Sequence, residues 1–298
     1  MPYRMIATPF PIDIDGTLSP LSRGHADPTI RLNRGEAWAT FRTPNGPATL
    51  AVGSFGLDVR AEAWGPGAAW ALEQAAALIG AEDDLSGFEP QHDTIRELWK
   101  THPGIRITRA WGVMRVIVPT ILEQKVTGIE ARRAYRAMVL ATSEPAPGPS
   151  GLFLPPDPAV LAATPYFTFH PWGVEQRRAE TVRAACAQPP QLEAAAELPL
   201  EQAKERLARI PGVGPWTVAE VARLALGDPD AVSVGDFHLA NDVCWALAGE
   251  ARGTDDRMLE LLEPYRGQRG RVQVLIEAGG ITAPKFGPRV RPGAIEQL

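Results

Sequence analysis

The stretch from residue 207 to residue 241 constrains the fold of this chain more than any other. It contains a bend, Pro211-Gly212-Val213-Gly214-Pro215, between two runs whose apolar residues recur at helical spacing. Glycine adopts positive φ angles without strain, so glycines this close to two helix ends allow a tight hairpin. Pro215 suits the first position of a helix, where its missing N–H would be unpaired in any case. The pattern predicts a helix, a bend and a second helix.

The bend also has the features of an anion-binding site. We expect the amides of Gly212, Val213 and Gly214, with those of the Trp216–Thr217 turn, to point outward and attract a negative group. A loop that binds a nucleoside triphosphate would need Gly-Lys-Ser/Thr, and no lysine stands here. The pattern favours a backbone phosphate of DNA, although a plain turn between two helices is the alternative.

A single acidic residue, Asp236, follows the bend by one helix and a loop, and it precedes an apolar run. An aspartate there can cap the next helix and stabilise it by about 1 kcal/mol. The same amide contacts would hold a charged carboxylate in one direction, which suits the stabilisation of positive character on a sugar. Capping and catalysis are therefore compatible. The nearby Asp228 and Asp230 belong to an Asp-Pro-Asp sequence, which is typical of a turn.

The string from Leu207 to Ala219, followed by Val234-Gly235-Asp236-Phe237-His238-Leu239, resembles the helix-hairpin-helix DNA glycosylases. It is most similar to the 3-methyladenine DNA glycosylase II group. The order of motifs is similar too, with a helix end at Ile121 to Val126 preceding the bend. The resemblance implies that Gly212, Val213, Gly214 and Thr217 hold DNA and that Asp236 is catalytic.

Trp216 stands where glycosylases with lyase activity carry a lysine. An amine at this place forms a Schiff base with the sugar, which an indole cannot do. The resemblance therefore implies a monofunctional enzyme, in which water is the nucleophile and the product is an abasic site in an uncut strand. Trp216, Trp172 and Phe167 are the aromatic residues expected to line the base pocket, with a core tryptophan as the equally open alternative for Trp216.

Two further positions follow from the resemblance. Gln124 and Lys125 end a helix. In the family, this helix end carries the residue that fills the gap in the DNA when the damaged base rotates out of the duplex, so both residues are expected to contact DNA. For Lys125, a solvated side chain is the alternative. The aromatic residues that the group carries near the end of its last core helix are absent, and Leu275-Ile276-Glu277-Ala278 stands there instead.

The pattern along the chain predicts an α+β protein. Residues 1–93 are expected to form an antiparallel sheet-and-helix domain, with a hairpin about 44–47, a strand at 59–64 and a helix at 68–79. Residues 94–280 are expected to form an all-helical glycosylase domain with a cleft between two subdomains, and residues 281–298 a loose tail. Pro119 is expected to kink or interrupt a helix at 110–122.

Composition limits the remaining possibilities. The two cysteines follow no metal-binding spacing, and no signal peptide or apolar run of membrane-spanning length is present, so we expect a cytoplasmic monomer without a metal centre. The resemblance implies a monovalent cation bound at carbonyl groups of the hairpin. The net charge of −5 counts against DNA binding, but backbone amides attract phosphate without formal charge.

Three functions remain after this reading. The first is a monofunctional glycosylase that flips alkylated, 3-methyladenine-type bases out of double-stranded DNA and hydrolyses the N-glycosidic bond. The second is a helix-hairpin-helix protein that binds DNA structures without catalysis, in which Asp236 is only a cap. The third is a helical interaction protein that binds no DNA, which would agree with the acidic charge.

Overall fold

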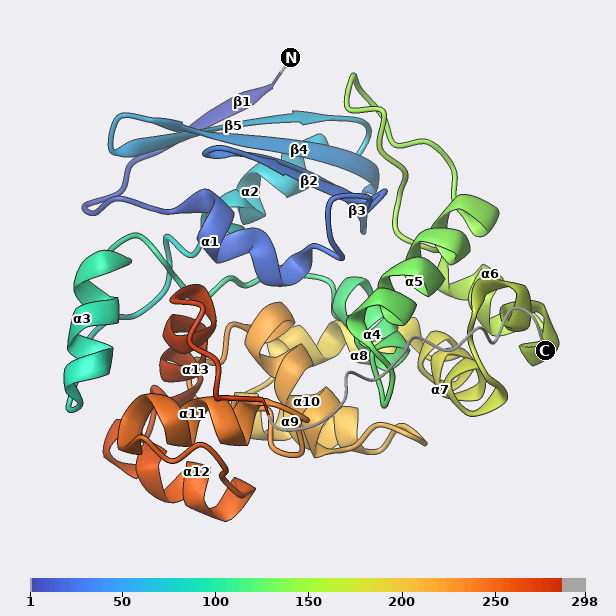
Figure 1. Cartoon of the computed structure of the whole chain (residues 1–298). Coiled ribbons are helices and arrows are strands. Elements are labelled where there is room, and N and C mark those ends of the chain that lie inside the picture. The colour runs from blue at the N-terminus through green and yellow to red at the C-terminus, as the bar shows by residue number, and fades with distance from the viewer. Residues whose placement is uncertain (1, 286–298) are drawn as a thin grey trace.

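The structure, a computed structural model, describes residues 2–285, and an antiparallel sheet lies on one side of a body of short helices (Figure 1). This arrangement confirms the predicted α+β class. Within the described residues, no helix combines the length and the apolar character that crossing a membrane would require. Residues 281–285 have no regular secondary structure, and the rest of the predicted tail lies outside the described residues.

The N-terminal sheet has five antiparallel strands in the described chain, in the order β1-β5-β4-β3-β2. They are β1 (Tyr3–Ile6), β2 (Ile30–Asn33), β3 (Glu36–Thr43), β4 (Gly46–Phe55) and β5 (Asp58–Trp64). The predicted hairpin is β3–β4, closed where Thr43 pairs with Gly46. Alternate residues of the strands are buried on one face, for example Leu50 opposite Ala63. The helix α2 (Ala68–Leu78) packs on β4 and β5 and covers the sheet.

A first lobe joins this sheet to most of the helices through one hydrophobic core. Its elements outside the sheet are α1 (Ile14–Leu18), η1 (Ser19–Leu21), α2, α4 (Val113–Leu122), α5 (Gly128–Thr142), α6 (Pro158–Ala163), η2 (Tyr166–Trp172), α7 (Gln176–Cys186), α8 (Pro189–Glu193), η3 (Ala194–Glu197), α9 (Leu200–Ala208), α10 (Pro215–Val221) and the π-helix η4 (Ala222–Leu226). We call this body the sheet lobe.

A second lobe has its own hydrophobic core. It consists of α3 (Asp93–Thr101), α11 (Leu239–Ala248), α12 (Asp255–Leu262), η5 (Glu263–Tyr265) and α13 (Arg269–Ala278). We call it the C-terminal lobe, although α3 reaches it from the first half of the chain (Figure 1). After η4, residues 227–238 cross from the sheet lobe to the C-terminal lobe, and this crossing segment carries Asp236.

The interior proline of α4 does not interrupt the helix, and the alternative expectation of a kink stays a prediction. Pro119 lies within a continuous helix, Val113–Leu122, and its neighbour Thr120 donates a hydrogen bond from its hydroxyl to the Val116 carbonyl at 2.8 Å. Nine of the ten residues of α4 are buried, so packing in the sheet lobe compensates for the backbone hydrogen bond that a proline cannot make. The helix therefore continues to Leu122 and delivers its C-terminal end to the bend.

Candidate active site

The bend between α9 and α10 forms as the sequence predicts, but only one of its glycines needs to be glycine for backbone reasons. Gly212 has φ +86°, whereas Gly214 has φ −102°, which any residue can adopt. A Cβ atom on Gly212 would lie 2.1 Å from the Thr181 hydroxyl of α7. Gly212 therefore allows both the left-handed turn and the close approach of the bend to α7.

The amides of the bend are partly used inside the protein. The Val213 amide donates to the Ile210 carbonyl at 3.0 Å, so the expectation that it points outward is wrong. In contrast, the amides of Gly212, Gly214, Trp216 and Thr217 donate no hydrogen bond within residues 2–285. Pro215 stands at the first position of α10, as predicted, and leaves the next two amides of the helix free. The cradle for an anion is thus built from glycine amides and the first turn of α10.

Gln124 joins the end of α4 to the bend. Its side-chain amide donates to the Gly212 carbonyl at 3.1 Å and to the Thr217 hydroxyl at 2.9 Å. Thr217 is only 1% exposed, and its hydroxyl serves this internal contact. Lys125, the next residue, has φ +55° and an exposed side chain. The structure therefore brings all of the predicted DNA-binding positions together, with Gln124 as a structural link between them.

This geometry predicts different effects for the two glycines. Gly212→Ala should lower the free energy of unfolding by more than about 1–2 kcal/mol, since the left-handed backbone and the contact with Thr181 both oppose a methyl group. Gly214→Ala is the matched control, because a Cβ there meets no atom within 4 Å. Urea denaturation of both variants measures the difference, and equal stability of the two would contradict the geometry.

Asp236 is anchored through both of its carboxylate oxygens. Its Oδ1 accepts the backbone amides of His238 at 2.8 Å and Leu239 at 2.9 Å, which begins α11. Its Oδ2 accepts a hydrogen bond from the indole N–H of Trp216 at 3.1 Å. The capping role of Asp236 is confirmed, because one oxygen caps the helix, and the other oxygen faces the first turn after the bend. The crossing segment and the bend meet at this contact.

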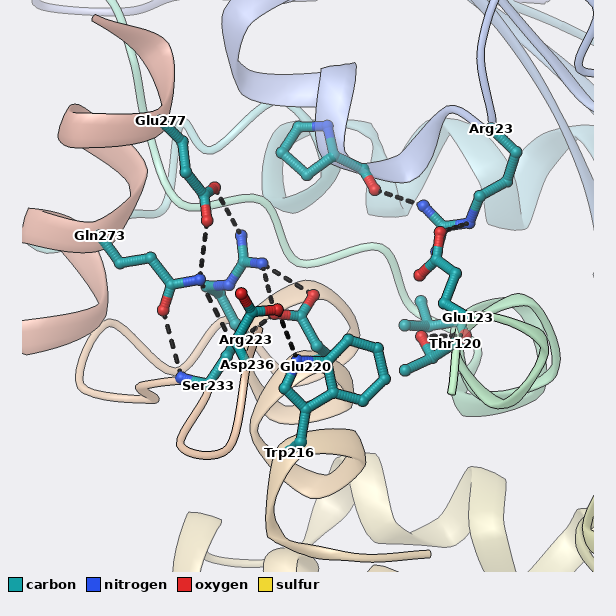
Figure 2. Close-up of polar contacts among 12 residues, drawn as sticks. Arg23, Thr120, Glu123, Trp216, Glu220, Arg223, Ser233, Asp236, Gln273 and Glu277 are labelled. Carbon is teal, nitrogen blue, oxygen red and sulfur yellow. Dashed lines mark hydrogen bonds and ion pairs between the residues drawn. The ribbon is translucent and has the colours of Figure 1, made fainter. Parts of the chain in front are cut away.

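A buried ionic network lies behind Asp236 (Figure 2). Glu220 of α10 accepts two hydrogen bonds from Arg223, at 2.8 and 2.9 Å, and a third from the Ser233 hydroxyl. Burial works against the charge of Glu220, but Arg223 and Ser233 outweigh it and lower the pKa of this carboxyl. Because the Asp236 amide donates to the Ser233 carbonyl at 3.1 Å, the network also fixes the backbone that carries Asp236.

Two residues from other parts of the sheet lobe face this network in Figure 2. Glu123 ends α4, and its Oε1 lies 3.3 Å from the Nε atom of Arg23, which follows η1. Burial raises the pKa of Glu123, and the nearby Arg23 only partly compensates. The N-terminal part of the chain therefore contributes a charged residue close to the end of α4, although the sequence alone gave this part no role at the site.

Among the predicted pocket aromatics, only Trp216 meets Asp236 in the described residues. Phe167 and Trp172 lie in η2, which packs against α5 and α7. Phe167 is 61% exposed and packs edge-on against Tyr166, whereas Trp172 packs edge-on against the buried Phe169. Their part in a base pocket stays a prediction.

The basic residues near the C-terminus do not form a free patch. Arg266 pairs with Glu263, Arg269 with Asp230, and Arg271 with the buried Asp83.

The two other aspartates near Asp236, Asp228 and Asp230, are both engaged in structural contacts. Asp230 pairs with Arg269, and its backbone amide donates to Asp228 Oδ1, as the predicted turn requires. Asp228 in turn pairs with Lys204. Neither aspartate is available for chemistry.

Positive side chains do surround the bend. Lys125 follows Gln124, Arg209 precedes Ile210 at the end of α9, and Arg177 lies one turn before Thr181 on α7. All three side chains are exposed, and none forms an ion pair with another residue of the described chain. The elements around the bend thus carry three exposed positive side chains without an ion-pair partner among the described residues, even though the whole chain carries −5.

The bend offers carbonyl oxygens to the monovalent cation that the resemblance implies. The Ile210 and Gly212 carbonyls each accept one hydrogen bond and keep a second lone pair. This donor set fits a weakly held cation, whose binding stays a prediction. Among residues 2–285, no group of three or more histidine, cysteine, aspartate or glutamate residues has the arrangement of a metal site.

Comparison with solved structures identifies the fold. The chain has the fold of the helix-hairpin-helix DNA glycosylases. A 3-methyladenine DNA glycosylase from Archaeoglobus fulgidus superposes with a TM-score of 0.78 over 92% of this chain and 97% of its own, at 15% identity. An 8-oxoguanine glycosylase/lyase from Clostridium acetobutylicum superposes with a TM-score of 0.70 over 93% and 96%, at 12% identity.

Comparison of sequences shows a further similarity. A probable bifunctional transcriptional activator/DNA repair enzyme AlkA from Mycobacterium tuberculosis is 30% identical over 169 residues, which is 56% of this chain. The chain spans 32% of the length of that relative, so the match concerns one part of a longer protein. No protein-family model matches the chain.

Proposed function

We propose that the chain is a monofunctional DNA glycosylase that removes alkylated, 3-methyladenine-type bases from double-stranded DNA in base-excision repair. The observation that carries this proposal is the contact between Trp216 and Asp236, which anchors one carboxylate beside an outward-facing amide cradle. The glycosylase fold and the sequence of the mycobacterial DNA repair relative support it.

The DNA backbone docks on the bend in this proposal. A phosphate accepts hydrogen bonds from the amides of Gly214 and the first turn of α10, while Lys125, Arg177 and Arg209 attract the neighbouring phosphates. Few charged residues take part, so the affinity should fall only modestly as salt concentration rises. The damaged nucleotide then rotates out of the stack, which costs less when its pairing is already weakened.

The chemistry depends on Asp236. Loss of the base leaves positive character on the deoxyribose, and a carboxylate held by three N–H donors stabilises that charge without reorganising. The N-glycosidic bond breaks, its electron pair leaves with the base, and water adds to C1′ and releases one proton to the solvent. The product is an abasic site in an intact strand.

Trp216 stands where glycosylases with lyase activity carry a lysine. We therefore expect the protein to have no lyase activity. With a duplex that contains 7-methylguanine, the wild-type protein should yield strand breaks only after alkali treatment. Borohydride should trap no covalent protein–DNA adduct, because an indole forms no Schiff base. A trapped adduct would contradict the monofunctional assignment.

The same assay tests the alternatives. A non-catalytic helix-hairpin-helix protein would retard abasic or mismatched duplex in a gel without releasing base. A protein that binds no DNA would give no salt-dependent shift. Release of free base together with enzyme-dependent abasic sites supports the glycosylase. DNA binding without release of base would instead support the non-catalytic helix-hairpin-helix protein.

A further inference from the structure

Asp236 is the last residue of a tight turn that begins at Ser233. The Asp236 amide donates to the Ser233 carbonyl at 3.1 Å, and Gly235 between them has φ +86°. A β-turn of this kind needs a left-handed residue at its third position, which glycine supplies without strain. The Gly235 amide also donates to Asp255 of α12 at 3.1 Å. The turn 233–236 is therefore held as one unit, and a shift of Ser233 is passed on to Asp236.

Ser233 uses all of its polar groups inside the protein, and it is only 1% exposed. Its backbone amide donates to Gln273 Oε1 of α13 at 3.2 Å, and Gln273 Nε2 donates to the Ser233 hydroxyl at 3.3 Å. The hydroxyl donates its own proton to Glu220 Oε1 of α10 (Figure 2). Gln273 thus attaches the turn to the C-terminal lobe, and the hydroxyl attaches it to the sheet lobe.

Two contacts with the turn come from one face of α10. Trp216 and Glu220 are four residues apart, so they project from the same side of the helix. Glu220 accepts the hydroxyl of the first residue of the turn, whereas Trp216 donates to the last residue, Asp236, at 3.1 Å. Contacts at both ends fix the orientation of a short segment as well as its place, which one contact alone would not do.

Glu220 is well held for this purpose. Arg223 donates two hydrogen bonds to its carboxylate, at 2.8 and 2.9 Å, and the side chain is 13% exposed. An acceptor that is locked by its own partners gives its hydrogen bond with Ser233 a defined direction. The same helix begins at Pro215, directly after the bend. α10 therefore sets the distance between the bend and Asp236.

We propose that Ser233 is a positioning residue: its hydroxyl, bound to Glu220, aligns the turn 233–236 on α10 and keeps Asp236 in place relative to the bend. This inference rests on the proposed glycosylase function. Ser233 is buried and acts through Asp236. Misplacement of a reacting group by about 1 Å can cost about 10²-fold in rate. Removal of the hydroxyl should therefore slow the chemical step without weakening the binding of DNA.

Ser233→Ala removes the hydroxyl and retains both backbone hydrogen bonds of the residue. We expect the single-turnover rate of 7-methylguanine excision, at saturating protein, to fall by about 10–10²-fold. The dissociation constant for a duplex that contains an abasic site should stay at the wild-type value, because the bend is unchanged. Circular dichroism establishes that the variant is folded at the assay temperature.

A second readout needs no DNA. The indole N–H of Trp216 gives a signal in a proton–nitrogen correlation NMR spectrum, and its loss in Trp216→Phe identifies it. Because this N–H donates to Asp236, the signal should move in Ser233→Ala as the carboxylate shifts. Gly235→Ala disturbs the same turn through its φ of +86°, while a Cβ there meets no atom within 4 Å. It should change the excision rate and the signal in the same directions as Ser233→Ala.

Thr49→Val is the control, because it also removes one buried hydroxyl. Thr49 of β4 is fully buried, and its hydroxyl donates to the Pro147 carbonyl at 2.6 Å. Both readouts should stay at the wild-type values.

Three results would overturn the inference: undiminished excision by Ser233→Ala, an unmoved Trp216 signal in that variant, or an equal loss of excision in Thr49→Val. In each of these cases, excision by the wild type would leave the proposed function standing. Absence of excision by the wild type would overturn the proposed function, and with it the role of Ser233.

Discussion

Asp236→Asn should lower the rate of base excision by about 10³-fold while leaving the fold and DNA binding in place. The asparagine oxygen can still accept the amides of His238 and Leu239, so α11 keeps its start. The other oxygen becomes an NH₂ group that faces the Trp216 N–H, so two donors oppose each other. The negative charge beside the deoxyribose is lost, and that loss accounts for most of the expected effect.

Single-turnover release of 7-methylguanine measures the rate, and a gel shift with duplex that contains an abasic site measures binding. Asp255→Asn is the matched control. Asp255 of α12 accepts a hydrogen bond at 3.1 Å from the amide of Gly235, the residue before Asp236, but it does not contact Trp216. Its amide oxygen can keep that bond, so both readouts should remain close to those of the wild type. Undiminished excision by Asp236→Asn would reduce Asp236 to a helix cap and remove the basis of the enzyme assignment.

The parts of the site that lie close together in the sequence could be predicted. The bend, the start of α10 at Pro215 and the capping role of Asp236 depend on residues within a few positions of one another. These features depend on local effects, namely the conformational freedom of glycine, the preference of proline for a helix start and side-chain capping, and local effects can be predicted from neighbouring residues. The β3–β4 hairpin was predictable for the same reason.

The tertiary partners of these residues could not be predicted. Gln124 reaches Gly212 across 88 positions, and Arg271 reaches Asp83 across 188. The Arg271 side chain pairs with Asp83, and the Gln124 amide donates to the hydroxyl of the buried Thr217. Only distances in space distinguish an arginine that is free to meet phosphate from one that is already paired. The DNA contact expected of Gln124 stays a prediction.

Asp83→Asn should lower the free energy of unfolding by about 3–5 kcal/mol, since it leaves the buried positive charge of Arg271 without its carboxylate and with only the neutral acceptors of Gln268 and Asp84. The two side chains are each 3% exposed, and they share two hydrogen bonds of 2.7 Å. Asp83 also accepts the Ile107 amide at 3.0 Å. An asparagine cannot serve all three donors, and its NH₂ group would face the guanidinium.

Urea denaturation followed by circular dichroism measures this effect. Glu263→Gln is the control, because it breaks a comparable arginine–carboxylate pair in solvent, where Arg266 and Glu263 are 69% and 53% exposed. A pair of this kind contributes less than about 1 kcal/mol. Equal stability of the two variants would show that the buried pair contributes no more than the exposed one.

The position of the Asp83–Arg271 pair connects this loss of stability to catalysis. Asp83 follows α2 in the sheet lobe and Arg271 lies in α13 of the C-terminal lobe, so the pair holds together the two lobes that the crossing segment joins. Asp236 caps α11 of the C-terminal lobe, while Trp216 and the bend belong to the sheet lobe. Asp83→Asn should therefore reduce excision at temperatures where the protein remains folded, because movement of the C-terminal lobe against α10 misaligns Asp236 with the bend. An unchanged excision rate in a destabilised Asp83→Asn variant would show that other contacts between the lobes are sufficient to hold the site.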